Sequence, residues 1–401
     1  MRRANRSSLL TDLFHDGLQS RQQLAATTAL SQASVSNLIG EMLEEGLVEE
    51  AGLVGSDGGR PRVLLRVRPG FRYVVGADVA ETRVLVELYD LAMNRLAAAE
   101  LAHDDDPPQV AAQLIKGLNA VLAEAGVSAG EVLGFGVGVP GVVDQDGVVD
   151  AQSTGWDAVP LGPMLRAATE VPIFVDNGAK TFGQAEMWFG AGRGARHAVI
   201  IMIGTGVGAA VVMDGRNYRG ANSNAGEWGH TTLIYDGEVC RCGARGCLEA
   251  YVGADGIARR LAAATGEPFG PELLAAQLAA DPIRPEAAEV FTETAGYLGA
   301  GIADLINLFS PERIVIGGIA GSIFGERFLT EIRNAAASHA LRRPYSQTSI
   351  ELCSLGIDAV AKGAATLPIA QLLADGGLPE PDEPMMAMPP RPRRPPERSR
   401  R

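Results

Sequence analysis

Three of the four cysteines of this 401-residue chain lie within eight residues, and this cluster restricts the possible folds more than any other feature. The segment reads Cys240-Arg241-Cys242-Gly243-Ala244-Arg245-Gly246-Cys247, and His230 is the nearest histidine. Three thiolates and one imidazole match a tetrahedral zinc site that leaves no open position, which favours a structural ion. We therefore predict one structural Zn²⁺ per chain, bound by His230, Cys240, Cys242 and Cys247. The alternative is a loop of free, reduced cysteines.

The same cysteine pattern indicates the compartment. A secreted framework would spread paired cysteines along the chain, whereas here they are concentrated in one short segment. The first residues, Met1-Arg2-Arg3-Ala4-Asn5-Arg6, are too polar for a secretory signal, and no run of about 18 apolar residues predicts a membrane span. We therefore expect a cytoplasmic protein with no membrane partner.

Charge is distributed unevenly along the chain. The total of 35 Lys and Arg against 48 Asp and Glu gives a net charge of -13, which taken alone argues against a nucleic-acid partner. However, residues 1–70 contain eight arginines and eight acidic residues, so the negative charge belongs to residues 71–375. Residues 376–401 are rich in proline and arginine and predict a disordered tail. The acidic total therefore does not exclude DNA binding by the first seventy residues.

Residues 1–70 have the pattern of a winged helix-turn-helix. An amphipathic helix is predicted over 7–15, and Ser20 with Gln23 forms a capping box that starts a second helix. Ser31 can cap a third helix, in which apolar residues recur at i, i+3, i+4, i+7 and i+8 from Val35. Two strands, at 47–50 and 63–67, follow and are joined by a glycine-rich hairpin, which would be the wing.

This segment also carries side chains suited to DNA. Short polar groups near the N-terminus of a recognition helix can reach base edges and phosphates. Arginines in a hairpin can enter the minor groove or bind phosphate. The predicted DNA contacts are Gln32, Ser34, Ser36, Asn37, Arg60 and Arg62. A small helical protein–protein module with a polar hairpin is the alternative, although it does not require the basic wing.

Residues 71–375 alternate strands with helices and predict an α/β fold. An amphipathic helix is predicted over 110–125. Strands are predicted at 73–79, 83–89, 132–137, 173–175, 198–203, 208–213 and 314–316. Glycines follow several of these strands, as in Gly204-Thr205-Gly206-Val207-Gly208 and Gly317-Gly318. Because α/β folds bind ligands at strand ends, we expect a binding site there.

From about residue 7 to residue 370 the chain resembles the ROK family of repressors, open reading frames and sugar kinases. The most specific motif is the spacing from Glu227-Trp228-Gly229-His230 to the cysteine segment and Glu249. Further matching motifs are Gly138-Val139-Pro140-Gly141, 188–194, 204–208, Arg219-Gly220-Ala221 and Leu305-Ile306-Asn307. The resemblance implies an actin-like ATPase (ribonuclease H-like) fold of two lobes over 71–375, with a zinc loop at 230–249 and a sugar between the lobes. An N-terminal winged helix marks the repressor branch of the family.

Two departures from the family's sugar kinases favour a regulator. The kinases begin with Asp-x-Gly-Gly-Thr, but this chain has Asp78-Val79-Ala80-Glu81-Thr82, which sets a carboxylate where ATP phosphates would lie. Like charges about 4 Å apart repel by about 1 kcal/mol in water and by several times that near a protein surface. The kinases also carry Asn-Asp-Ala-Asn, whose Asp is the general base; Gly178 stands at that position. General-base assistance is worth roughly 10²–10⁴-fold, so we predict no phosphoryl transfer and no catalytic residue.

The sugar-contacting positions of the resembling kinases are better preserved. Carboxylates suit this role because they accept hydrogen bonds from sugar hydroxyls, and His230 could use one ring nitrogen for zinc and the other for sugar. The predicted sugar-binding residues are Asn177, Glu227, His230 and Glu249. Alternatively, Glu227 and Glu249 only support the zinc loop.

We therefore predict a sugar-responsive DNA-binding transcriptional regulator of carbohydrate metabolism, a repressor in the simplest case, whose kinase-like domain senses a sugar or sugar phosphate. A homodimer or homotetramer on a palindromic operator is expected. The alternatives are an active ROK sugar kinase that phosphorylates a hexose or amino sugar, and a ligand-independent DNA-binding or scaffold protein.

Overall fold

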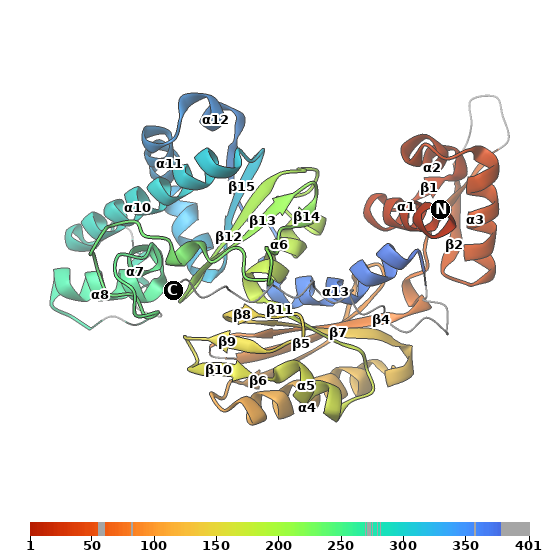
Figure 1. The fold of residues 1–401 in the computed structure, drawn as a ribbon, viewed down its shortest axis with the longest axis horizontal. Helices are drawn as coiled ribbons and strands as arrows, with labels where there is room; N and C mark the ends of the chain where they lie inside the picture. Colours follow the sequence, from red (N-terminus) through yellow and green to blue (C-terminus); the bar gives the residue numbers. More distant parts are fainter. Residues whose placement is uncertain are drawn as a thin grey trace, which may run out of the picture.

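The structure, a computed structural model, describes residues 1–377 except residues 55–60, 82, 269, 271–273, 275, 279, 281 and 357. Within this part, the chain forms an N-terminal unit of residues 1–68 and two larger lobes, each built on a five-stranded sheet (Figure 1). The disordered tail was predicted over residues 376–401, and all of it after residue 377 lies outside the described residues.

The N-terminal unit packs three helices against a three-stranded antiparallel sheet of order β1-β3-β2. Its elements are α1 (Arg2–Asp16), β1 (Gln19–Ser20), α2 (Arg21–Thr28), α3 (Gln32–Glu44), β2 (Val48–Val54) and β3 (Arg62–Val67). The predicted capping box of Ser20 and Gln23 is confirmed. The predicted apolar face of α3 is buried, although Leu43 is only partly so. Helix α1 starts five residues earlier than predicted, because Arg6 in its first turns pairs with Glu45 and replaces apolar packing.

The first lobe contains a sheet of order β11-β7-β4-β5-β6. Its strands are β4 (Tyr73–Val79), β5 (Arg83–Asp90), β6 (Arg95–Ala102), β7 (Val132–Val139) and β11 (Ile173–Asn177). Strands β4, β7 and β11 are parallel, whereas β5 and β6 run antiparallel to their neighbours. Helices α4 (Pro107–Ala125) and α5 (Leu161–Ala168) lie on one side of this sheet (Figure 1). A small sheet beside it contains β8 (Val142–Val143), β9 (Val149–Ala151) and β10 (Trp156–Val159).

The second lobe contains a sheet of order β14-β13-β12-β15-β16. Its strands are β12 (Ala198–Ile203), β13 (Val207–Met213), β14 (Arg216–Asn217), β15 (Arg313–Gly317) and β16 (Ser349–Leu352). Its helices are α7 (Glu249–Val252), α8 (Ala254–Thr265), α10 (Pro285–Phe309), α11 (Ile319–His339) and α12 (Arg342–Gln347). Short 3₁₀ helices η1 (Pro69–Phe71), η2 (Ala129–Glu131) and η3 (Trp228–His230) lie in the connections.

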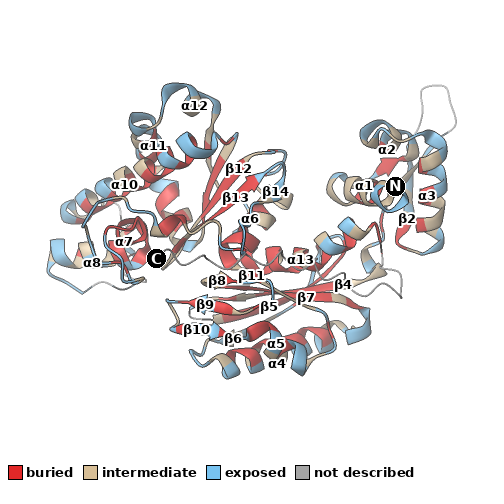
Figure 2. Cartoon of the chain, in the orientation of Figure 1, coloured by how far each residue is buried: buried red, intermediate tan, exposed pale blue. Residues whose placement is uncertain are grey.

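Two helices form a layer between the sheets. Helix α13 (Ala359–Asp375) packs on β4 and β7 of the first sheet, α6 (Gly178–Phe189) packs on β12 and β13 of the second, and the two helices pack against each other. The strands β4, β5, β12 and β13 at the centres of the two sheets are mostly buried (Figure 2). The predicted α/β architecture is thus confirmed, and the predicted strands correspond to β4, β5, β7, β11, β12, β13 and β15. None of the helices in the described part combines the length and the apolar character that a membrane span needs.

Candidate functional site

A cleft of about 890 Å³ separates the two lobes. Its walls come from the β4–β5 turn, the end of β7, the start of α6, the β12–β13 turn, and the segments that carry η3 and α7. All four residues that the resemblance assigns to sugar binding line this cleft: Asn177, Glu227, His230 and Glu249. Three separate chain segments therefore bring the predicted sugar-binding residues together.

Asn177 is held rigidly at the junction of β11 and α6. Its Oδ1 accepts the backbone N–H of Lys180 at 3.1 Å and so caps α6, and its Nδ2 donates to the Gly141 carbonyl at 2.5 Å. Asparagine is a preferred N-cap, which explains why the strand ends and the helix begins at this residue. Gly178, the next residue, lines the cleft without a side chain.

Glu227 and His230 flank the 3₁₀ helix η3. Burial raises the pKa of the Glu227 carboxyl above its usual range. The His230 ring lies with Nδ1 3.7 Å from Cys240 Sγ. Because Nδ1 faces the cysteines, Nε2 is the ring atom left for a cleft ligand.

The four predicted metal ligands form one cluster. The ligand atoms of His230, Cys240, Cys242 and Cys247 all lie within 4.8 Å of one another. Cys242 Sγ and Cys247 Sγ are 3.7 Å apart, close to the separation of about 3.8 Å expected for two sulfurs bound tetrahedrally at about 2.3 Å. The residues therefore fit a tetrahedral metal ion, and a His/Cys₃ cluster able to bind a metal is present.

The loop around the cluster needs glycine at Gly246. Its φ is 78°, and a Cβ there would lie 1.6 Å from the Ile234 carbonyl oxygen. Burial raises the pKa of the Cys240 thiol to about 12 and also raises that of Cys247. A metal ion would reverse this preference, because binding requires the thiolate.

Glu249 follows the cluster and is itself buried. Its Oε1 accepts Arg241 Nε at 2.9 Å, and its Oε2 accepts the backbone N–H of Val207 at 2.9 Å. Glu249 therefore supports the zinc loop and also lines the cleft, so the two roles considered from sequence are compatible.

Glu81 connects the two lobes across the cleft. Its Oε1 accepts the Thr205 hydroxyl at 2.6 Å and Arg241 Nη1 at 3.2 Å. Thr205 and Arg241 were not predicted as site residues. Nothing in the local sequence of either residue indicates these long-range contacts.

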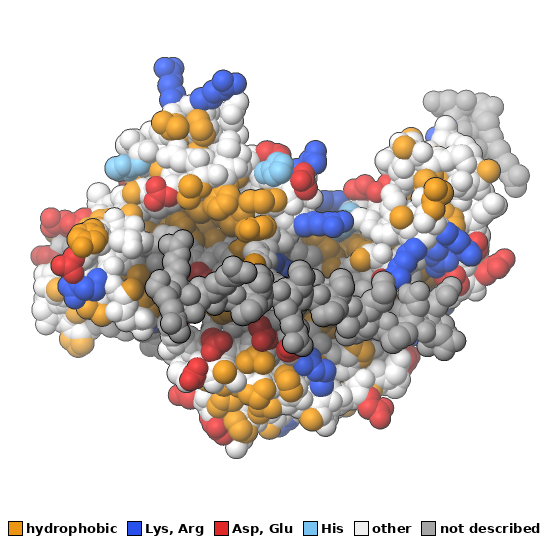
Figure 3. Space-filling view, viewed as in Figure 1, with side chains coloured by type: hydrophobic (Ala, Val, Ile, Leu, Met, Phe, Trp, Pro, Cys, Tyr) orange, Lys and Arg blue, Asp and Glu red, His pale blue; other side chains and the backbone are white. Residues whose placement is uncertain are grey.

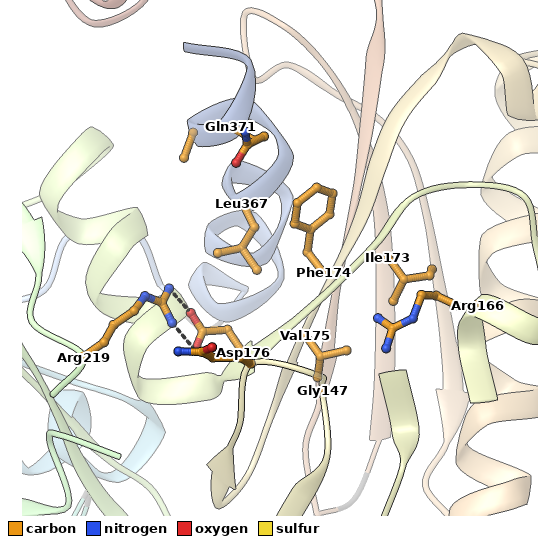
Figure 4. A pocket seen from close by; sticks show the side chains of 11 residues that line it. Gly147, Arg166, Ile173, Phe174, Val175, Asp176, Arg219, Leu367 and Gln371 are labelled. Carbon is orange, nitrogen blue, oxygen red and sulfur yellow. Dashed lines mark hydrogen bonds and ion pairs between the residues drawn. The ribbon is translucent and has the colours of Figure 1, made fainter. Parts of the chain in front are cut away.

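A second cavity of about 370 Å³ lies between β11 and α13 and is lined by Asp176, the residue that precedes Asn177. Figure 4 shows Arg219 directed at Asp176, with Leu367 and Gln371 of α13 on the opposite wall. The buried Asp176 carboxylate accepts both terminal nitrogens of Arg219, at 3.0 and 2.5 Å. This ion pair was also missed from sequence, although Arg219 belongs to a family motif; it holds the end of β11 immediately before Asn177.

The predicted DNA-contacting residues lie on α3 and β3. Gln32, Ser36 and Asn37 are exposed on α3, and Arg62 is exposed at the start of β3. Ser34 is half-buried because its backbone and hydroxyl both bond the N-cap Ser31. Arg60 lies outside the described residues. On the face shown in Figure 3, arginine side chains of the N-terminal unit lie beside acidic ones.

The N-terminal unit contacts both helices between the sheets. Phe14 of α1 makes edge-on ring contacts with Trp188 and Phe189 at the end of α6, at 5.4 and 6.3 Å between centroids. His15 packs edge-on against Trp188 at 4.8 Å, and burial lowers its pKa. Arg3 forms an ion pair with Asp375 of α13. Helix α6 therefore extends from the cleft to the N-terminal unit.

Comparison with known proteins gives consistent matches. Residues 74–371 match the ROK family. The xylose repressor of Caldicellulosiruptor bescii is 28% identical over 390 residues, which cover 93% of this chain and 97% of that protein. The glucokinase of Halalkalibacterium halodurans is 34% identical over 313 residues, which cover 74% of this chain and 94% of that protein. A crystal structure of a ROK family transcriptional regulator, a homologue of the Escherichia coli MLC protein, matches with a TM-score of 0.79 at 27% identity over 94% of this chain and 97% of that chain.

Proposed function

Because the chain belongs to the ROK family, we propose that it is a sugar-responsive DNA-binding transcriptional repressor of carbohydrate metabolism. Its two lobes have the actin-like ATPase fold of that family. One observation carries the proposal: an interlobe cleft lined by the predicted sugar-binding residues is joined, through α6, to a unit with helix-turn-helix geometry. Full-length similarity to a xylose repressor and to a ROK regulator supports it.

In this proposal the sugar binds to Asn177, Glu227, His230 and Glu249. Each carboxylate oxygen has two lone-pair sites, so Glu249 can accept from a sugar hydroxyl while it holds Arg241 and Val207. The Nε2 atom of His230 is the natural partner for another hydroxyl. The half-buried Glu227 carboxylate would accept a further sugar hydroxyl.

The metal in this proposal is a structural Zn²⁺ held by Cys240, Cys242, Cys247 and His230 Nδ1. With all four positions filled by protein, the ion would supply a cross-link and no Lewis-acid step. It would fix the direction of His230 and the position of the segment up to Glu249. Sugar affinity should therefore depend on the metal.

The route from sugar to DNA runs along α6. The N-cap of this helix, Asn177, is in the cleft, and its last residues, Trp188 and Phe189, contact Phe14 of α1. A lobe rotation that moves α6 must therefore move or release α1. The sugar shifts the equilibrium only by its differential affinity for the two arrangements.

The DNA contacts in this proposal are Gln32, Ser34, Ser36, Asn37, Arg60 and Arg62. Ser34 would contact DNA only by leaving its bond to Ser31. A cytoplasmic homodimer or homotetramer would present two α3 helices to half-sites about 34 Å apart, so small rotations would prevent simultaneous docking.

We propose that the domain transfers no phosphoryl group. Gly178 offers no general base, and Glu81 bonds Thr205 of the glycine-rich turn Gly204–Gly208. We call this part of the cleft its phosphate end, because glycine-rich turns can bind phosphate. The second candidate function is a sugar kinase. It is favoured by the 34% identity to a glucokinase and by the presence of Asp78 and the Gly204–Gly208 turn in the cleft wall.

The deciding experiment measures binding to DNA upstream of the protein's own gene at about 50 mM salt, where phosphate contacts are strong. D-xylose or D-glucose should lower the affinity at least about tenfold, since about 1.4 kcal/mol of coupling suffices. Glu227→Gln should bind DNA normally but ignore sugar, whereas Asn37→Ala should lose DNA binding but keep a sugar-induced thermal shift.

Failure to bind any promoter DNA would refute the repressor proposal. DNA binding unaffected by a panel of sugars would favour a ligand-independent protein. ATP-dependent phosphorylation of glucose that Glu227→Gln abolishes would establish the kinase instead.

A further inference from the structure

The two lobes are tied together by side chains at the phosphate end of the cleft. Glu81 lies in the β4–β5 turn of the first lobe, and its Oε1 accepts Thr205 Oγ1 of the second lobe at 2.6 Å. The same oxygen accepts Arg241 Nη1 at 3.2 Å. We call the contacts of Glu81 with Thr205 and Arg241 the interlobe clasp. One carboxylate of the first lobe thus bonds two segments of the second.

Arg241 is itself held in place by a second carboxylate, that of Glu249. Its Nε donates to Glu249 Oε1 at 2.9 Å, and it stands between the metal-cluster residues Cys240 and Cys242. Its guanidinium lies on the backbone of the β12–β13 turn, because a Cβ at Gly206 would be 2.4 Å from Arg241 Nη2. The cation therefore covers the glycine-rich turn and is neutralised by two carboxylates.

Two of the backbone donors that such a turn would offer to a phosphate are already used. Glycine-rich turns bind phosphate through free backbone N–H groups. Here the Gly204 N–H donates to the Gly206 carbonyl at 2.8 Å, and the Val207 N–H donates to Glu249 Oε2 at 2.9 Å. A bound phosphate would have to displace Glu81 and break these contacts.

The charged side chains that line the cleft also disfavour a phosphate. Two arginines, Arg83 and Arg241, line the cleft together with a larger number of acidic residues. The acidic residues are Asp78, Glu81, Asp150, Glu227, Glu249 and Asp255. Charges in a narrow cleft act on a ligand more strongly than in bulk water. An anionic ligand is therefore repelled, and an uncharged polyol is not.

We propose that the interlobe clasp fills the phosphate end of the cleft with the chain's own charges and restricts the cleft to unphosphorylated sugars. The ligand class rests on the proposed sugar-sensing function, but the exclusion of phosphates does not. Sugar phosphates and nucleotides are excluded for one shared reason, the pairing of Glu81 with Arg241.

Titration calorimetry on the full-length protein tests this with D-glucose, D-xylose, D-glucose 6-phosphate and inorganic pyrophosphate. The wild type should bind one of the free sugars at least about tenfold more tightly than glucose 6-phosphate, a difference of about 1.4 kcal/mol. Glu81→Gln removes one of the two carboxylates that pair with Arg241 and should bind pyrophosphate at least about tenfold more tightly than the wild type. The double variant Glu81→Gln/Arg241→Gln should return to the wild-type level.

Asp214→Asn removes an exposed carboxylate paired with Arg196 outside the cleft and should gain no pyrophosphate binding. Asp214→Asn should also match the wild type in thermal unfolding and in DNA binding without ligand. The clasp is refuted if Glu81→Gln gains nothing, or if the wild type binds glucose 6-phosphate as tightly as the free sugars. A wild type that binds no sugar, with the Glu81→Gln gain intact, would sink the sugar-sensing function and leave the phosphate exclusion standing.

Discussion

The two lobes repeat one strand arrangement, and their matching turns differ in the residues that face the cleft. In each sheet the central strand, β4 or β12, forms a hairpin with the next strand and lies parallel to a later one, β7 or β15. Both hairpin turns are short: β4 ends at Val79 and β5 starts at Arg83, whereas β12 ends at Ile203 and β13 starts at Val207. The middle residues of the two turns, Glu81 and Thr205, bond each other.

The two turns differ in the groups that they present to the cleft. The second turn has a glycine on each side of Thr205, whereas the first carries the Glu81 carboxylate, which accepts the Thr205 hydroxyl. The second lobe also contains the His/Cys₃ cluster, which reaches the same turn through Arg241. The first lobe thus supplies the carboxylate of the clasp, Glu81, and the cysteine segment of the second lobe supplies its cation, Arg241.

Removing the proposed metal should have the largest effect, because its four ligands all lie in the second lobe. Cys242→Ser should lower the free energy of unfolding by at least about 3 kcal/mol, since metal binding contributes directly to folding. Calorimetry and metal analysis would measure this. Cys353→Ser is the matched control, because Cys353 contacts Ser322 and is outside the cluster. Full metal content in Cys242→Ser would rule out the site.

Substitution within the second turn should be position-specific. A Cβ at Gly206 would lie 2.4 Å from Arg241 Nη2 and 3.2 Å from Glu249 Oε2, whereas one at Gly204 meets nothing within 4 Å. Gly206→Ala should therefore cost about 1 kcal/mol in urea unfolding, because the end of the flexible Arg241 side chain can move aside, and Gly204→Ala should stay within about 0.5 kcal/mol of the wild type. Equal effects would show that Arg241 does not lie on this turn.

Asp78 of β4 and Met202 of β12 occupy matching positions and both line the cleft. Burial raises the pKa of Asp78 to about 7, so the folded state favours its neutral form and the wild type loses stability as pH rises from about 4 through 7. Asp78→Asn should therefore be more stabilising at pH 8 than at pH 5, by at least about 1.4 kcal/mol, one pKa unit. Denaturant titrations at the two pH values measure this difference. A pH-independent effect would contradict it.

The smallest effect should come from the clasp itself. About a third of the Glu81 and Arg241 side chains is exposed, and such pairs contribute roughly 0–1 kcal/mol. Glu81→Gln should therefore change the free energy of unfolding by less than about 1 kcal/mol, measured at low and high salt. A larger loss would mean that the clasp holds the fold together rather than selecting the ligand.

Local patterns were enough to predict much of the architecture. The strands at 73–79 and 198–203 match β4 and β12 because continuous apolar, β-branched runs define buried strands. The capping box of Ser20 and the buried face of α3 followed from spacing alone. The His/Cys₃ cluster was predicted from its compact spacing, and the structure brings its atoms together.

Contacts between distant segments were not predictable in the same way. Glu81 is 124 positions from Thr205 and 160 positions from Arg241, so only the folded arrangement brings them together. Helices α6 and α13 are buried between two sheets, and α13 has no clear polar face from which a helical period could be read. The Asp176–Arg219 pair was missed for the same reason: the residues come from β11 and the segment after β14.

The place of Arg241 between two cysteines also affects how this lineage can evolve. Reverting Glu81 alone leaves Arg241 held by Glu249 over the second turn. Placing a carboxylate at Gly178 alone leaves Glu81 bonded to Thr205 and Arg241. Under the proposed function, neither single substitution is therefore enough to produce a kinase, and phosphoryl transfer would require changes at several positions together.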